Sequence, residues 1–343
     1  MHAALWISVF AAAFVATGVL YQIIGSWHDR RVYASGRWVP IGNGARLYLF
    51  ELGGGDGEPT VVFEAGIGAT HLNWRTIQET IAENARAVSY DRCGLGWSSR
   101  CRTARTPANI AAELHQMLHG AGLKPPFVLV GHSFGGLVMR RFALLYPGEV
   151  AGVVLVDPMR CEEWPPLDPS KQSQVDLGRR LIRYAVPVAG CGLARLMASL
   201  LFCRAAHVSD QIASAAGPNS RHVLDRIKTE VGKMPRAVWP AVAAHWSRPG
   251  FYAGLRHHIQ SIPATVTEMH AAEPIRSIPI TVLSPGNSAP LSDDDLSRIG
   301  DRTNQLIARK SEHWIHLDEP DLVIGSIRAM LEVLSAETFA AAD

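Results

Sequence analysis

The sequence predicts an α/β fold. A mostly parallel, doubly wound sheet carries an inserted helical cap, and an N-terminal transmembrane helix precedes it. Short apolar runs with few polar residues recur along the chain, as in strands that are covered on both faces. Helical segments separate these runs, which is typical of βαβ units. The alternation stops between Asp157 and Ile280, where we expect the cap. The apolar runs lie at 60–63, 87–90, 127–130, 152–156 and 280–283.

The first element is an apolar segment, Ala3–Ile24, that contains no charged residue. As a helix it would span about 33 Å, close to the thickness of a bilayer, so we expect a single-pass membrane anchor. A cleaved signal peptide is the alternative, although the segment lacks a basic start and is long for that role. Arg30 and Arg31 follow it and favour a cytoplasmic location for the rest of the chain.

The next elements lead into the core. Residues 26–36 are predicted to form a polar linker, and Asn43-Gly44 predicts a hairpin turn between two short strands. Helical spacing over 75–84 and 106–119 then separates the buried strands. We therefore predict an anchor at 3–24, a first part of the core at 37–158, a cap at 159–275 and a second part of the core at 276–334.

The composition excludes some classes of function. Of 343 residues, 48% are hydrophobic, enough for a large core, and the net charge of +2 gives no electrostatic case for nucleic acid. There is no C-x-x-C or H-E-x-x-H motif. His115 and His119, like His313 and His316, have a spacing that a metal could use, but neither pair has a nearby cysteine or a second pair of ligands. We expect neither a metal nor a cofactor.

The five cysteines match no disulfide framework. Free thiols are the simplest expectation, and Cys191 with Cys203 is the pair that could bond.

The corner Gly131-His132-Ser133-Phe134-Gly135 follows an apolar strand and precedes a helix. A G-x-S-x-G corner places a serine on a sharp turn with its hydroxyl outward, and the glycines leave room for neighbouring backbone. The helix that follows directs its N-terminus at the serine, which favours an oxyanion there. Ser133 is therefore the predicted nucleophile.

A glycine loop after the 60–63 strand supplies the predicted oxyanion hole. Glu64-Ala65-Gly66-Ile67-Gly68 ends that strand and can turn a backbone N–H toward the serine. The N–H groups of Ile67 and Phe134 would together hold the oxyanion.

The general base and its acid come from later in the chain. His313 is the first histidine after the last predicted strand and is the preferred base, with His316 as the alternative. For the acid that orients it, Asp157 ends the strand after the nucleophile helix. The alternatives are Asp293, Asp294 and Asp295, which are typical of the first turn of a solvated helix.

These motifs resemble those of the α/β-hydrolase superfamily, in its serine esterase and lipase-like branch. The resemblance covers about 37–334 outside the cap and is carried by Glu64–Gly68 with Trp74, Tyr90–Ser98, Gly131–Gly136, and His313 with Glu319-Pro320.

The resemblance bears on the site residues. In many members the acid follows the strand that here ends near Leu283, but this chain has Ala289 where that aspartate would stand. Haloalkane dehalogenases often carry the acid one strand earlier, which matches Asp157. Dehalogenases and epoxide hydrolases share the fold but use an aspartate nucleophile, and Ser133 argues against both activities. Asp91 and Arg92 are expected to hold the loop that borders the pocket.

The sequence thus predicts a membrane-anchored serine hydrolase that cleaves carboxylic esters through an acyl-enzyme intermediate. Its expected substrate is a small-molecule ester with an apolar acyl chain. The alternatives are an amide, thioester or carbon–carbon bond hydrolase with the same triad, or a non-catalytic receptor for a small ligand.

Overall fold

The computed structural model describes residues 2–54, 59–161, 169–202 and 229–342. Its contacts divide the chain into two compact units. The helical unit comprises residues 1–35 and 168–256, and the sheet unit comprises residues 36–167 and 257–343. Residues 257–275, which the sequence assigns to the cap, cluster with the sheet. The cap boundaries stay a prediction.

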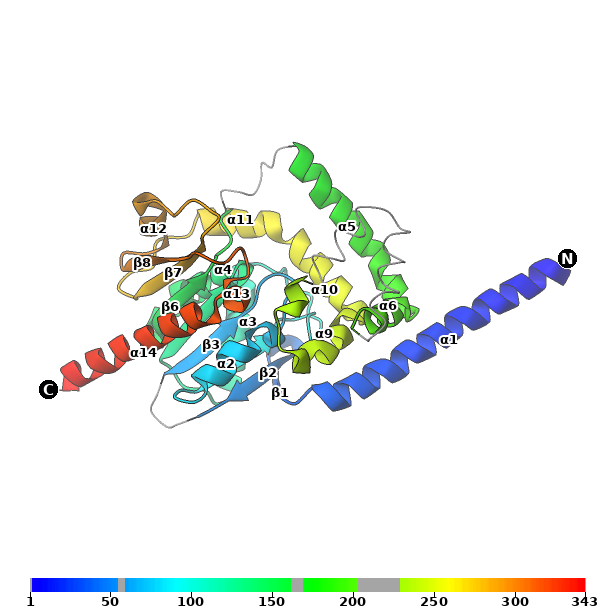
Figure 1. The fold of residues 1–343 in the computed structure, drawn as a ribbon, viewed down its shortest axis with the longest axis horizontal. Coiled ribbons are helices and arrows are strands. Elements are labelled where there is room, and N and C mark those ends of the chain that lie inside the picture. Colours follow the sequence, from blue (N-terminus) through cyan, green and yellow to red (C-terminus); the bar gives the residue numbers. More distant parts are fainter. Residues whose placement is uncertain (1, 55–58, 162–168, 203–228, 343) are drawn as a thin grey trace. The chain divides into compact units, whose positions relative to one another are not determined.

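An eight-stranded sheet, in the order β1-β2-β4-β3-β5-β6-β7-β8, forms the sheet unit within the described residues (Figure 1). β2 pairs antiparallel with β1 and with β4, and every other neighbouring pair is parallel. The mostly parallel α/β sheet predicted from the sequence is therefore confirmed. The strands are β1 (Arg37–Pro40), β2 (Arg46–Leu52), β3 (Thr60–Glu64), β4 (Ala87–Asp91), β5 (Phe127–His132), β6 (Val150–Val156), β7 (Ile280–Pro285) and β8 (Thr303–Ala308).

Helices cover both faces of this sheet, as the uninterrupted apolar strands require. One core lies under α3 (Pro107–Gly120), α4 (Phe134–Leu145) and α12 (Asp293–Ile299). A second core lies under α2 (Arg75–Ile81) and α14 (Pro320–Ala342). The sheet unit also holds α11 (Ile262–His270), α13 (Ile315–Asp318) and the 3-10 helices η1 (Gly42–Gly44), η2 (His71–Trp74) and η3 (Pro147–Glu149).

The strand register brings the predicted motifs together at one edge of the sheet. Glu64 at the end of β3 pairs with Gly131, and His132 at the end of β5 pairs with Val156. The glycine loop, the serine corner and the residue after β6 therefore follow the carboxyl ends of adjacent parallel strands. Ligands of open α/β sheets bind at this edge.

The helical unit contains the N-terminal helix, α1, which packs on α5 and α9. At Gly18 the approach is close, because a Cβ atom there would lie 2.2 Å from the carbonyl oxygen of Cys191. The described elements of this unit are α1 (His2–Tyr33), α5 (Pro169–Gly190), α6 (Leu193–Phe202), η5 (Arg236–Val238) and α9 (Trp239–Trp246), and α10 (Pro249–Gln260) runs across the boundary.

The predicted linker over 26–36 was wrong for most of its length, because α1 continues to Tyr33. Ser26–Tyr33 contains no proline or glycine to end the helix. Buried contacts also stabilise the C-terminal turns of α1. Asp29 is 7% exposed and accepts a hydrogen bond from Nη1 of Arg195 at 2.7 Å. Among the described residues, the segment Ala4–Tyr33 is long and apolar enough to cross a membrane, and an 18-residue window within it has a mean hydropathy of 2.0.

Candidate active site

Ser133 lies on a strained turn between β5 and α4. Its backbone has φ 54° and ψ −120°, a conformation that side-chain-bearing residues rarely adopt. The flanking glycines permit the turn. A Cβ atom on Gly131 would lie 2.6 Å from the carbonyl oxygen of Gly135, and one on Gly135 would lie 2.5 Å from that of Glu64. The glycine spacing of the sequence motif therefore reflects real backbone crowding around the serine.

The loop after β3 borders this serine. A Cβ atom on Gly66 would lie 3.5 Å from the Cβ of Ser133, so the loop backbone runs directly beside the serine side chain. Among the described residues, the backbone N–H groups of Ile67 and Phe134 donate to no other protein group. Both predicted oxyanion donors are therefore free to bind a ligand oxygen.

His313 and Asp157 form a direct pair. Nδ1 of His313 lies 2.7 Å from Oδ2 of Asp157. Asp157 has a positive φ of 41°, and its N–H donates to the carbonyl oxygen of Leu283 at 2.8 Å, which joins the loop after β6 to β7. The imidazole of His313 is 43% exposed, so it remains accessible from solvent.

The alternative acids are used differently. Asp295 accepts hydrogen bonds from the N–H and hydroxyl of Ser292 and completes the capping box of α12. Asp294 pairs with Arg298 at 2.8 Å on the exposed side of that helix. Asp293 lies in the same first turn. The geometry thus places Asp157, and not this acidic turn, against His313.

His316 occupies a packed position. It is 1% exposed, and its ring centroid lies 4.7 Å from that of Trp74 and 4.3 Å from that of His132. The sequence indicated His316 as the alternative base, with no sign that three histidines would gather beside Ser133.

His132 connects the serine corner to the segment that carries His313. Nε2 of His132 lies 2.8 Å from the carbonyl oxygen of His313 and must donate to it. Burial, with His316 and His313 nearby, holds the pKa of His132 well below its usual range. A neutral ring that donates from Nε2 fits this position, and it fixes the backbone of His313 relative to Ser133.

A buried polar network holds the glycine loop. Arg92 donates from Nη2 to the carbonyl oxygen of Gly66 and pairs with Glu64, and its guanidinium lies 5.2 Å from the ring centroid of Phe134. The hydroxyl of Tyr90 donates to Glu64. Burial raises the pKa of Glu64 to about 7, against the opposing effects of Arg92 and Tyr90.

Asp91 completes the support, as the sequence predicted for Asp91 and Arg92. It accepts hydrogen bonds from the N–H groups of His71 and Trp97, at 3.0 and 2.9 Å. The sequence did not reveal Glu64 as a partner of Arg92. The only signal was a carboxylate at the end of an apolar strand, which does not reveal burial.

Comparisons with known proteins agree with this architecture. A family model described as the alpha/beta hydrolase fold matches residues 59–207. A solved esterase from Thermogutta terrifontis aligns with a TM-score of 0.58, covering 88% of this chain and 99% of that one at 19% identity. A Pseudomonas aeruginosa structure titled "putative epoxide hydrolase" aligns with a TM-score of 0.65, covering 88% and 97% at 17% identity.

The chain therefore has the α/β-hydrolase fold. At such low identity the two solved structures show this fold and not a substrate.

Curated relatives match a shorter part of this chain. YqjL of Bacillus subtilis is 35% identical over 99 residues, or 29% of this chain and 39% of that protein. RutD of Escherichia coli, named a "putative carbamate hydrolase", is 35% identical over 100 residues, or 29% of this chain and 36% of that protein. The matches therefore span about two fifths of the length of these relatives.

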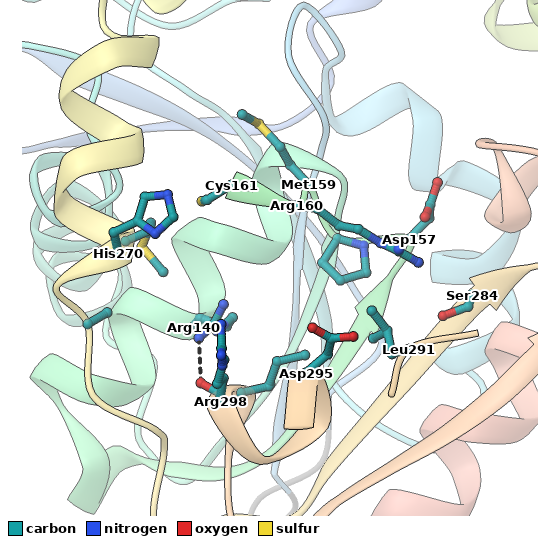
Figure 2. Close-up of a pocket in the computed structure, with 14 residues that line it drawn as sticks. Arg140, Asp157, Met159, Arg160, Cys161, His270, Ser284, Leu291, Asp295 and Arg298 are labelled. Atoms are coloured by element: carbon teal, nitrogen blue, oxygen red, sulfur yellow. Dashed lines mark hydrogen bonds between the residues drawn. The ribbon is translucent and has the colours of Figure 1, made fainter. Parts of the chain in front are cut away.

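A cavity of about 280 Å³ lies beside Asp157, on the side of α11 and α12. Figure 2 shows Arg140, Arg160, Arg298 and Asp295 among the residues that line it. Neither Ser133 nor His313 lines this cavity, so it does not identify the position of the substrate.

Two clusters of histidine, cysteine and glutamate side chains lie close together elsewhere in the part of the chain that the structure describes. Nε2 of His115 and Nε2 of His119 each bind one oxygen of Glu149, at 3.0 and 2.9 Å. The spacing in the sequence indicated the histidine pair but not this carboxylate, which is 30 residues away from His119. The second cluster contains Cys93 and Cys101. Cys191 is a free thiol, and Cys203 lies outside the described residues.

Proposed function

We propose that the protein is a serine hydrolase that cleaves carboxylic esters, with Ser133 as nucleophile, His313 as base and Asp157 as the acid that orients it. The observation that carries this proposal is the 2.7 Å contact between Asp157 and His313 at the sheet edge where Ser133 occupies its strained turn. Position 133 holds serine and not aspartate, which supports acyl transfer over the chemistry of epoxide hydrolases.

The reaction follows from the positions of these groups. Asp157 accepts a hydrogen bond from Nδ1 of His313, which leaves the lone pair on Nε2 to take the Ser133 proton. The serine oxygen attacks the acyl carbon, and the carbonyl oxygen becomes an oxyanion that accepts hydrogen bonds from Ile67 and Phe134. The intermediate then expels an alcohol, which receives the proton from His313. Water activated by the same histidine releases the acid.

Several classes of bond are substrates for a serine triad of this kind. An ester is favoured because the motifs around Ser133 and His313 resemble those of the serine esterase and lipase-like branch. The name of the RutD relative suggests a carbamate as a second class of substrate. Amide, thioester and carbon–carbon bonds would use the same triad. A non-catalytic receptor would not need the free oxyanion donors or the Asp157–His313 pair.

We also propose that α1 is a retained membrane anchor. A cleaved signal peptide would remove Gly18, which lies against Cys191, and Gln22, whose side-chain oxygen accepts a hydrogen bond from Arg195 at 3.1 Å. The helical unit also exposes apolar side chains beyond α1: Tyr184, Val188, Leu193 and Leu196 are 41–58% exposed. A lipid surface would cover them. Arg30 and Arg31 favour a cytoplasmic catalytic unit.

The test uses the full chain in detergent micelles. A fluorophosphonate probe should label Ser133, and Ser133→Ala should abolish labelling together with turnover of p-nitrophenyl esters. Matched esters, anilides, thioesters and carbamates then rank the bond classes by kcat/KM. Absence of labelling from folded protein would favour the receptor, and faster carbamate than ester cleavage would overturn the choice of bond.

A further inference from the structure

Two thiols and an arginine come together next to Arg92, the residue that holds the glycine loop of the predicted oxyanion hole. Cys93 follows β4 and is 1% exposed, and Cys101 lies half-buried in the segment that leads to α3. The two sulfur atoms and a carboxylate oxygen of Glu113 all lie within 4.8 Å of one another.

Arg105 organises this cluster. Its Nη1 donates to Sγ of Cys101 at 2.8 Å and to Oε1 of Glu113 at 2.7 Å, while Nη2 donates to Oε2 of Glu113 at 2.7 Å. Thr103 donates to the same sulfur at 3.5 Å. A sulfur that accepts hydrogen bonds from a buried guanidinium is stabilised as a thiolate.

The two thiols differ in reactivity. A hydrogen bond from Cys93, together with Arg105 and Thr103, lowers the pKa of Cys101 to about 7. The hydrogen bond to Cys101, with burial, raises the pKa of Cys93. Cys101 therefore ionises more readily than Cys93, which remains a thiol within 4.8 Å of it.

The same atoms could also ligate a cation, but the charges disfavour it. The guanidinium of Arg105 already contacts Cys101 and both oxygens of Glu113. A metal ion would have to displace this cation from a buried position. Oxidation of the thiols needs no such displacement.

We propose that Cys93 and Cys101 form an oxidative modification site, at which a hydroperoxide converts the two thiols into an intramolecular disulfide. The Cys101 thiolate attacks one oxygen of hydrogen peroxide, the O–O bond breaks, hydroxide leaves, and Cys101 becomes a sulfenic acid. The Cys93 sulfur then attacks the Cys101 sulfur, the S–O bond breaks, and the hydroxyl leaves as water with the Cys93 proton. Two sulfurs are oxidised and one peroxide is reduced.

This modification would act on Ser133, a consequence that rests on the proposed function. Cys93 follows Arg92, which donates to the carbonyl oxygen of Gly66, and Gly66 precedes the oxyanion donor Ile67. A disulfide holds its two sulfurs at about 2.05 Å, so the segments that carry Cys93 and Cys101 must approach each other when it forms. Any movement of Cys93 would displace its neighbour Arg92 and disturb the glycine loop.

The experiment treats the reduced full chain in micelles with hydrogen peroxide, blocks free thiols, and digests it with trypsin without reduction. Cleavage after Arg92, Arg100 and Arg102 separates the two cysteines, so the disulfide appears as peptide 93–100 linked to peptide 101–102. Cys161→Ser should leave this product unchanged. Cys93→Ser should instead leave a Cys101 sulfenic acid that dimedone traps.

Two readouts separate the chemistry from its effect. We expect the linked peptide to form at least tenfold faster than oxidation of the exposed Cys191, and fluorophosphonate labelling of Ser133 to slow several-fold and recover with dithiothreitol. Equal oxidation of Cys101 and Cys191, with no linked peptide in the wild type, overturns the proposal. A linked peptide without slower labelling overturns its effect on Ser133. Failure of the reduced protein to label counts against the proposed function alone.

Discussion

The sheet unit and the helical unit bury charge in different ways. Beside Ser133, Arg92 contacts Glu64, Gly66 and Phe134, and all four residues lie in sequence motifs at the ends of adjacent strands. In the helical unit, Arg195 of α6 reaches Asp29 of α1, from which it is separated by 166 residues of sequence. Parallel strands bring motif residues together by topology, whereas helices meet through side chains that no motif reveals.

This contrast predicts where substitutions act. Changes at the sheet edge should affect turnover more than stability, because the strands fix the positions of the site residues. Changes at the contact between α1 and α6 should affect the stability of the helical unit and leave the chemistry of Ser133 intact.

The largest effect is expected for His313→Ala. Loss of the base in a serine triad lowers kcat by about 10⁶-fold, with little change in the folded state. His316→Ala should lower kcat by about tenfold or less, because that ring packs on Trp74. Ester turnover and circular dichroism of both variants provide the measurement. An inactive His316 variant beside an active His313 variant would exchange the two roles.

Asp157→Asn should lower kcat by about 10⁴-fold, because an amide cannot stabilise the imidazolium and favours the wrong tautomer of His313. Asp294→Asn is the matched control, since its carboxylate pairs with Arg298 on the exposed side of α12. Full activity of the Asp157 variant with loss at Asp294 would place the acid after β7.

The sequence was sufficient to predict the buried strands, and the triad that it suggested stays a prediction. Apolar runs over 60–63 and 127–130 identified two buried strands, and the glycines around Ser133 identified the corner between the second of these strands and the helix after it. Proximity of Glu64 to Arg92, and of Glu149 to His115, could not be predicted. Both depend on three-dimensional packing, and a carboxylate has the same sequence signal whether it is buried or solvated.

The end of α1 was mispredicted for a related reason. Polar residues after Gly25 resemble a linker in composition, but Asp29 is buried by its contact with Arg195. Composition reports how polar a segment is and not which partner it finds.

Asp29→Ala in the full chain should lower the free energy of unfolding of the helical unit by about 3 kcal/mol. The substitution leaves Arg195, which is 7% exposed, without its carboxylate partner. Adding Arg195→Met should restore most of the loss, whereas Arg183→Met, at an exposed position, should not. Thermal unfolding and limited proteolysis in micelles follow the effect. Unchanged stability of the Asp29 variant would mean that α1 does not pack on α6 in the membrane-bound protein.

Glu64 should make stability depend on pH in the sheet unit. Burial raises its pKa from 4.5 to about 7, so between these values the folded state holds a proton that the unfolded state has lost. The protonated Glu64 carboxyl therefore contributes fully to the free energy of unfolding below pH 4.5. This contribution falls by about 3 kcal/mol between pH 4.5 and pH 7 and is lost above pH 7.

Chemical denaturation between pH 5 and pH 8 tests this dependence. Glu64→Gln removes the titrating group, so the variant should lose less stability than the wild type as the pH rises. Parallel pH profiles for the two proteins would show that Glu64 is already ionised at pH 5.

The smallest effect concerns the acyl chain, and it tests whether the helical unit contributes to specificity. Each buried methylene adds up to about 0.8 kcal/mol of transition-state binding, or roughly fourfold in kcat/KM. We expect kcat/KM to rise from acetate to esters of about four to eight carbons and then to level off once the acyl chain fills its apolar pocket.

Leu193 and Leu196, which are 48% and 47% exposed, are the residues to replace in testing whether the helical unit forms part of this pocket. If they contact lipid, Leu193→Ser with Leu196→Ser should weaken binding to vesicles and leave the chain-length profile unchanged. A profile that shifts toward acetate in this variant would assign them to the substrate instead, and a steady fall from acetate onward in the wild type would remove the acyl pocket from the proposal.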